Sequence, residues 1–69
     1  MNTETYITEN NIITIEFEML DITTYVWKIL KDNEFCCKCI VPYATKEGMY
    51  ESARLKVYEL FPNVTLKDF

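Results

Sequence analysis

The chain has 69 residues, 49% of them hydrophobic and 14% aromatic, and its formal net charge at pH 7 is −4. A chain of this length forms one small domain (residues 1–69) with a thin core, and self-association is a common way to stabilise such a domain. Residues 1–27 contain five carboxylates and no lysine or arginine, and this one-sided charge disfavours direct binding to nucleic acid phosphates and favours a basic partner.

The N-terminal part of the sequence predicts β-strands. Residues 1–11 are expected to be either flexible or a short edge strand, ending at the turn-forming pair Asn10-Asn11. From residue 12 to residue 20, hydrophobic and polar residues alternate, which predicts a strand with one buried face. The solvent face of this strand carries Glu16 and Glu18.

Two further strands follow in the prediction. Residues 24–31 are β-branched and aromatic, and Asp32-Asn33 is a good hairpin turn. The alternation resumes over residues 35–41 and ends at Pro42, which cannot donate a hydrogen bond to a neighbouring strand. One face of this strand is expected to carry Phe35, Cys37, Cys39 and Val41.

A helix is predicted after the strands. Thr45 is a suitable N-cap, and Pro62 ends the helix after about Phe61. Leu55 and Tyr58 lie on the side opposite the apolar stripe that should pack on the sheet. That stripe comprises Met49, Tyr50, Ala53, Val57, Leu60 and Phe61.

The predicted fold class is therefore α+β. It is a three- or four-stranded antiparallel meander with one C-terminal helix packed on one face of the sheet. Residues 63–69 form a tail, which is either a short edge strand or an arm that covers Leu55 and Tyr58.

The residue types exclude most catalytic chemistry. The chain has no histidine, one glycine and one serine, so it lacks the usual general base, a glycine-rich phosphate loop and a Ser-His pair. We expect neither enzymatic activity nor a cofactor. Strand alternation places Cys36 opposite Cys37 and Cys39, so the three thiols are expected to be reduced hydrophobic residues without a metal, unless a dimer pools them.

The candidate sites are surfaces for protein binding. Glu16, Glu18 and Asp21 are either a solvated face or an acidic surface for a basic partner. Leu55 and Tyr58 are covered either by the tail or by another chain, which includes a second copy in a homodimer.

Strands followed by a helix that opens at Thr45-Lys46-Glu47 resemble, over about residues 12–61, the arm-type DNA-binding domains of integrases. The last strands and helix of double-stranded-RNA-binding domains have a similar outline. Both resemblances imply a basic contact surface, whereas this chain carries Glu16 and Glu18 on its first clear strand. Short acidic α+β chains without a catalytic set also resemble phage-encoded inhibitors, including anti-CRISPR proteins and DNA mimics.

We therefore expect a small acidic protein-binding domain that inhibits a nucleic-acid-handling protein by engaging its basic surface. The alternative is a homo-oligomeric accessory or structural subunit that assembles through the back of its helix or an edge strand. The N-terminus has no secretory signal, and no apolar run approaches the roughly 18 residues of a membrane span. We expect a cytoplasmic protein that does not bind membranes, located in the host cell if its source is a phage.

Overall fold

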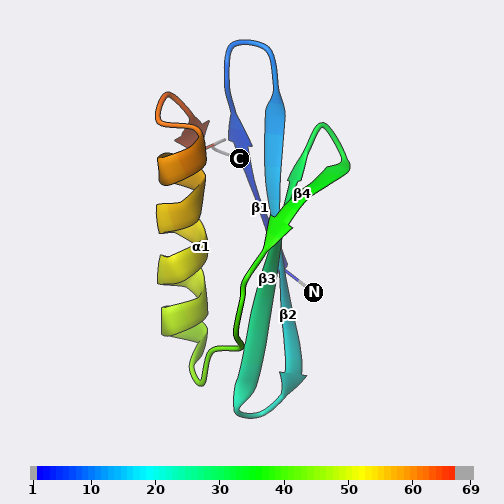
Figure 1. Ribbon diagram of the computed structural model, residues 1–69, viewed down its shortest axis with the longest axis vertical. Coiled ribbons are helices and arrows are strands. Elements are labelled where there is room, and N and C mark those ends of the chain that lie inside the picture. Colours follow the sequence, from blue (N-terminus) through cyan, green and yellow to red (C-terminus); the bar gives the residue numbers. More distant parts are fainter. Residues whose placement is uncertain (1, 67–69) are drawn as a thin grey trace.

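The computed structural model describes residues 2–66 and confirms the predicted α+β meander with one C-terminal helix (Figure 1). Four strands follow one another along the chain as β1 (Asn2–Ile7), β2 (Ile12–Asp21), β3 (Thr24–Lys31) and β4 (Glu34–Lys38). The helix α1 (Lys46–Leu60) then leads to a short strand, β5 (Thr65–Leu66). All pairings are antiparallel in the order β4-β3-β2-β1-β5, so β5 lies outside β1 at the edge.

The predicted hairpin turn at Asp32-Asn33 joins β3 to β4. Both residues have positive φ, 52° and 69°, as a two-residue type I′ turn requires. The carboxylate of Asp32 also accepts hydrogen bonds from the backbone N–H of Ile12 at 2.9 Å and from the Asn11 side chain at 2.7 Å. Asp32 therefore holds the two turns at this end of the sheet together, and these hydrogen bonds lower its pKa.

The turn between β1 and β2 lies where the Asn10-Asn11 pair predicted it, but for a different reason. Among the described residues, positive φ occurs only at Asp32 and Asn33. The turn is organised instead by Thr8, whose hydroxyl accepts from the Asn11 backbone N–H at 2.9 Å. A threonine hydroxyl can replace a backbone acceptor in this way.

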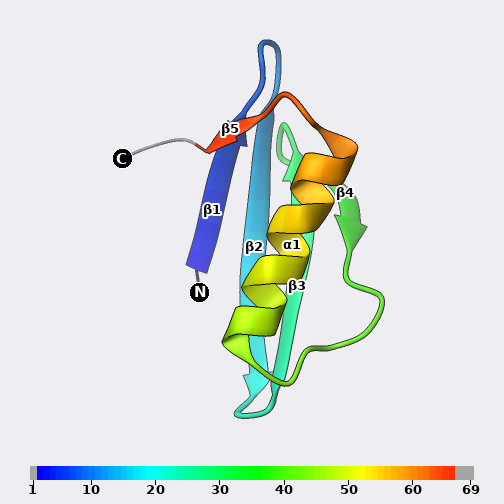
Figure 2. The ribbon, with the colours of Figure 1, turned by 90° about the vertical axis from the view of Figure 1, so that its left-hand side faces the viewer.

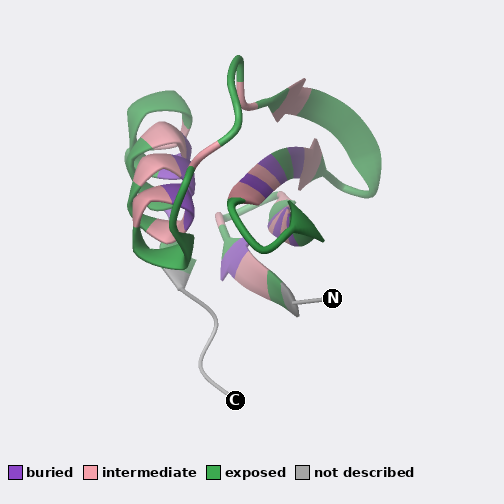
Figure 3. Cartoon of the chain, turned by 90° about the horizontal axis from the view of Figure 1, so that it is seen from below, coloured by how far each residue is buried: buried purple, intermediate pink, exposed green. Residues whose placement is uncertain are grey.

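The core lies between α1 and one face of β2 and β3. Figure 2 shows the helix lying across these strands, and Figure 3 shows its buried residues on the side that faces the sheet. The helix contributes Met49, Ala53 and Val57 to the core. Leu60, which was predicted to belong to the apolar stripe, is 41% exposed. Val64, which follows the helix, is buried. The remaining core residues are Tyr6, Ile13, Ile15, Phe17, Tyr25, Trp27 and Ile29.

A bulge in β4 changes the faces that simple alternation predicts. Leu30 pairs with Phe35, but Ile29 pairs with Cys37, so Cys36 is an extra residue in β4. Phe35 therefore lies with Leu30 on the face away from the helix and is 61% exposed. The prediction that Phe35 shares a face with Cys37 is wrong, because the bulge shifts the alternation by one residue.

The chain leaves the sheet sooner than the sequence predicts. β4 ends at Lys38, and Cys39 still donates to the Trp27 carbonyl at 3.1 Å. Tyr43 then forms two 2.8 Å backbone hydrogen bonds with Tyr25. Between these two contacts, β3 has a single residue, Val26, whereas the other chain segment has three, residues 40–42. The three residues therefore project from the sheet.

The helix begins and ends as predicted. Thr45 is its N-cap, and its hydroxyl accepts from the backbone N–H of Gly48 at 3.0 Å. The chain leaves the helix at Phe61, whose N–H still donates to the Val57 carbonyl, and Pro62 follows. The two caps therefore set the length of the helix.

The core predicts a clear contrast between two isoleucines. Ile29 is fully buried, so Ile29→Val should lower the free energy of unfolding by about 1 kcal/mol through the lost methyl group and the space it leaves. Ile22 is 82% exposed, and Ile22→Val should change stability by less than about 0.5 kcal/mol. Urea denaturation followed by circular dichroism measures both, and equal effects would contradict this placement of the core.

Candidate protein-binding surfaces

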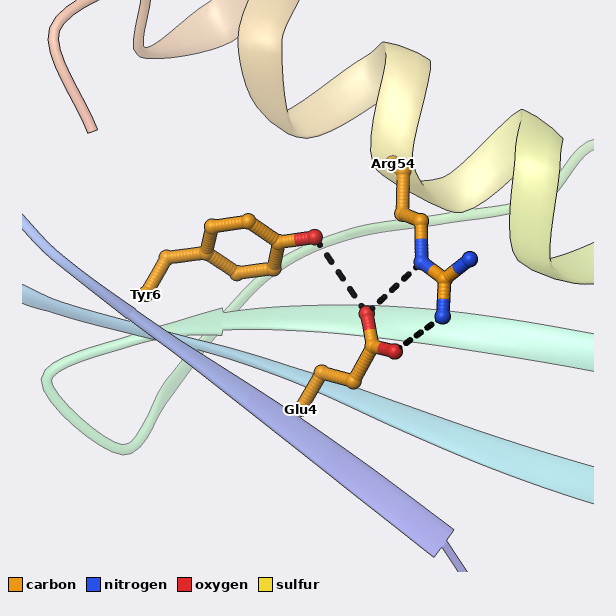
Figure 4. A network of polar contacts seen from close by, with 3 residues as sticks. All are labelled: Glu4, Tyr6 and Arg54. Atoms are coloured by element: carbon orange, nitrogen blue, oxygen red, sulfur yellow. Dashed lines mark hydrogen bonds and ion pairs between the residues drawn. The ribbon is translucent and has the colours of Figure 1, made fainter. Parts of the chain in front are cut away.

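A bidentate ion pair joins the first strand to the helix (Figure 4). Arg54 on α1 donates to both carboxylate oxygens of Glu4 on β1, from Nε at 3.0 Å and from Nη2. The Tyr6 hydroxyl donates to the same carboxylate at 3.2 Å. The Arg54 hydrogen bond is the main cause of a lowered pKa at Glu4, whereas burial chiefly raises the pKa of Tyr6 to about 12.

The predicted acidic residues of β2 are only partly available to a partner. Glu16 forms an ion pair with Lys28 on β3, at 3.2 Å between Oε1 and Nζ. Asp21 accepts from the backbone and side chain of Thr23, and these bonds contribute to a lowered pKa. Glu18 is exposed, and its carboxylate has no ion pair or hydrogen bond with any residue from 2 to 66.

The structure places Glu16 and Glu18 on the face of the sheet that points away from α1, which we call the open face. Asp21 lies beyond them, at the turn from β2 to β3. Because Lys28 and Lys38 are opposite one another in the register, they also lie on this face. The open face therefore carries both signs of charge, unlike the acidic surface that the sequence suggested.

An acidic and apolar surface lies on the outer side of the helix. It comprises Glu47, Glu51, Leu55 and Tyr58, which we call the helix face. Leu55 is 63% exposed and Tyr58 is 47% exposed, and all four residues line one shallow hollow of about 390 Å³. Within residues 2–66, neither glutamate has an ion pair or hydrogen bond from its carboxylate.

Leu55 and Tyr58 were predicted from the sequence as binding residues, whereas Glu47 and Glu51 were not. The signal was present in the spacing, because residues 47, 51, 55 and 58 recur at intervals of three or four and so share a helical face. Like charges four residues apart destabilise a helix by a few tenths of a kcal/mol. Glu47 lies in the first turn of α1, where the favourable interaction of its carboxylate with the helix dipole offsets this repulsion.

Of the three tail residues expected to provide cover, Val64 is buried in the core. The backbone of Leu66 pairs with Tyr6 in the register of β5 and β1. Tyr58 packs edge-to-face on Tyr6, with ring centroids 5.9 Å apart. Phe69, the third residue expected to provide cover, lies outside the described residues.

A groove lies on the open face beside the projecting residues 40–42. It has a volume of about 420 Å³, and its lining includes Glu18, Leu20, Ile40 and Val41. Ile40 is 99% exposed, Val41 is 59% exposed and Leu20 is 56% exposed. The groove was not predicted from the sequence, because the alternation over residues 35–41 indicated a strand that continues through Val41, whereas β4 ends at Lys38.

The three cysteines lie at the bulged end of the sheet. Cys36 is exposed, and Cys37 and Cys39 are half-buried. Burial is the main cause of a raised pKa at Cys37. Within residues 2–66, no three or more Cys, Asp or Glu side chains are grouped to hold a metal ion.

The Glu4–Arg54 pair predicts a specific dependence of stability on pH. The pKa of Glu4 is lower in the folded state than its usual 4.5, so its ionised form contributes stability that is lost as the pH falls through the folded-state pKa. Glu4→Gln should therefore destabilise the protein at neutral pH, and its effect should shrink below about pH 4.5.

Urea denaturation over a pH series at constant ionic strength measures this difference from the wild type. Glu9→Gln is a matched control, since Glu9 is exposed on the turn between β1 and β2. A destabilisation by Glu4→Gln that is the same at every pH would contradict the ion pair.

Alkylation should distinguish the thiols. Cys36 is exposed, whereas Cys37 is half-buried and its raised pKa leaves less of the reactive thiolate. We expect brief treatment of the native protein with iodoacetamide to modify Cys36 first, as peptide mapping by mass spectrometry would show. A first adduct at Cys37 would contradict the bulge that places Cys36 at the surface.

The geometry thus provides two surfaces, the helix face and the groove on the open face. Within residues 2–66, no helix combines the length and the apolar character needed to cross a membrane. Comparisons of the chain with protein-family models, curated proteins and solved structures found no match.

Proposed function

We propose that this protein is a non-enzymatic binding domain whose helix face engages a basic surface of a nucleic-acid-handling protein and inhibits it. One observation carries the proposal: two carboxylates without a partner among the described residues stand beside two exposed hydrophobic side chains. The carboxylates are those of Glu47 and Glu51, and the hydrophobic residues are Leu55 and Tyr58. A partner that buries the hydrophobic residues and supplies lysine or arginine satisfies both halves of this surface.

The nearby cation does not neutralise this acidic surface. Arg54 also lines the hollow, but its guanidinium is bound to Glu4 and lies over the ring of Tyr50, 5.2 Å from the centroid. The carboxylate of Glu4 on β1 therefore neutralises the charge of Arg54. Glu47 and Glu51 keep their full attraction for an incoming base.

A basic protein surface that binds nucleic acid is a suitable target for such a face. The phosphates that it normally contacts are anions, and carboxylates on a compact domain can occupy the same positions. The net charge of −4 adds long-range steering toward that surface. Small acidic inhibitors encoded by phages, anti-CRISPR proteins among them, are the class that this description resembles.

Charge reversal on the helix face tests the proposal. The immobilised protein is used to capture partners from a cell extract, and the purified partner is then studied by surface plasmon resonance. Glu47→Lys combined with Glu51→Lys should lower the association rate by about tenfold or more at low salt, and by less at high salt. Addition of the wild-type protein should also release the partner from duplex DNA.

A matched control separates the helix face from net charge. Glu9→Lys combined with Glu34→Lys changes the charge by the same amount at two exposed positions, one on the turn between β1 and β2 and one at the start of β4. We expect the control to retain most of the association rate. Equal losses in the two variants would reject the helix face as the binding surface, and a partner that still binds DNA in the complex would reject inhibition by competition.

A further inference from the structure

The open face of the sheet is the second feature that the fold leaves exposed. Among the described residues, no helix covers it, and α1 contacts β2 and β3 from the other side. Its apolar residues include half-buried Val26 and exposed Leu20, Phe35 and Ile40. A stable monomer does not usually expose hydrophobic residues in such a cluster.

The charges on this face are arranged in a way that fits a copy of itself. In the centre, Glu16 and Lys28 neutralise one another through their ion pair. The side chains of Glu18 on β2 and Lys38 on β4 remain, and neither side chain has an ion pair or hydrogen bond with any residue from 2 to 66. The open face therefore presents one unpaired carboxylate and one unpaired ammonium group.

The register fixes where these two charges lie. Glu18 is opposite Val26, and Lys38 is opposite Lys28, so the charges are two strands and one same-face step apart. With strands about 4.8 Å apart and a rise of about 3.4 Å per residue, their Cα atoms are separated diagonally by roughly 12 Å. The middle of this diagonal falls on β3, between Val26 and Lys28.

We propose that two copies of the chain associate through their open faces about a two-fold axis. The axis lies in the gap between the two sheets, parallel to them. When it passes over the midpoint of this diagonal and runs perpendicular to it, Glu18 of each copy lies over Lys38 of the other. A two-fold interface requires this reciprocity, since every contact occurs twice with the roles exchanged. Glu18 and Lys38 satisfy this requirement, because the two residues of each copy form two equivalent ion pairs across the interface.

The apolar residues fit the same arrangement. The groove that contains Glu18 and Lys38 is also lined by Leu20, Val26 and Ile40. In the proposed dimer, the projecting Ile40 of each copy lies over the apolar part of the other copy's groove. The fully exposed Ile40 side chain thus becomes buried, and each thin core gains a second apolar layer.

This inference goes beyond the proposed function, because the helix face lies on the opposite side of the sheet. A dimer through the open faces leaves both helix faces accessible. It would therefore present two acidic binding surfaces that point away from each other.

Charge exchange within the chain provides the test, with purified protein and no other partner. Sedimentation velocity over a micromolar concentration series should show the wild type as a dimer. Glu18→Lys alone and Lys38→Glu alone each turn two attractions into two repulsions, and each should raise the dimer dissociation constant by on the order of 10- to 100-fold. The double variant Glu18→Lys/Lys38→Glu re-forms both pairs with reversed polarity, and it should dimerise nearly as well as the wild type.

Controls exclude effects of net charge and of misfolding. Glu9→Lys and Lys46→Glu make the same changes of charge at exposed positions away from the groove, and both should remain dimeric. Circular dichroism checks that every variant is folded, and Ile40→Asp should be a folded monomer.

Three results would overturn the proposal. The first is a wild type that stays monomeric throughout the series. The second is a double variant that remains monomeric when each single variant is monomeric. The third is a dimer that dissociates on Leu55→Asp and persists with Glu18→Lys, since the interface would then be the helix face. None of these results depends on the partner sought for the helix face.

Discussion

The packing of a single helix against one side of a sheet determines most of what this protein can do. Met49, Ala53 and Val57 close over the inner sides of β2 and β3, and every core residue faces this contact or adjoins it. With one helix among the described residues, only one side of the sheet can be covered. The outer side of the helix and the open face of the sheet must therefore both meet solvent or a partner, and both retain hydrophobic residues.

The electrostatic pattern also depends on tertiary contacts, because α1 and β3 bring cations to the acidic N-terminal strands. Arg54 reaches Glu4 only when α1 packs on the sheet, and Lys28 reaches Glu16 only through the pairing of β2 and β3. The five carboxylates of residues 1–27 consequently have different roles in the folded protein. Two carboxylates without a partner among the described residues lie together on the helix face, which belongs to the part of the sequence with a nearly balanced composition.

The sequence predicted elements whose signals are local. Alternation along β2, the Asp32-Asn33 turn and the Thr45 N-cap each depend on a few neighbouring residues, and each is confirmed. It failed where one extra residue changes a face or where partners are distant in the chain. The bulge at Cys36 moved Phe35 to the open face, and Glu4 meets a partner 50 residues away. No periodicity in the sequence encodes either feature.

The candidate site was predicted only in part for the same reason. Leu55 and Tyr58 follow from helical spacing, but the availability of Glu18 and the pairing of Glu16 depend on the register of the sheet.

The two proposed interfaces respond in opposite ways to the net charge of the chain. A charge of −4 on each copy attracts a basic partner to the helix face over long distances, yet it repels a second copy that approaches the open face. Self-association must then rest on short-range contacts, namely the Glu18–Lys38 pairs and the burial of Ile40. Salt screens the long-range repulsion between copies as well as the attraction to the partner, whereas the burial of apolar side chains is little affected by screening. Moderate ionic strength should therefore weaken capture of the basic partner more than it weakens the dimer.

If both interfaces form together, the two helix faces of one dimer can engage two sites of a partner at once. The second contact then gains from the raised local concentration when the sites are suitably spaced.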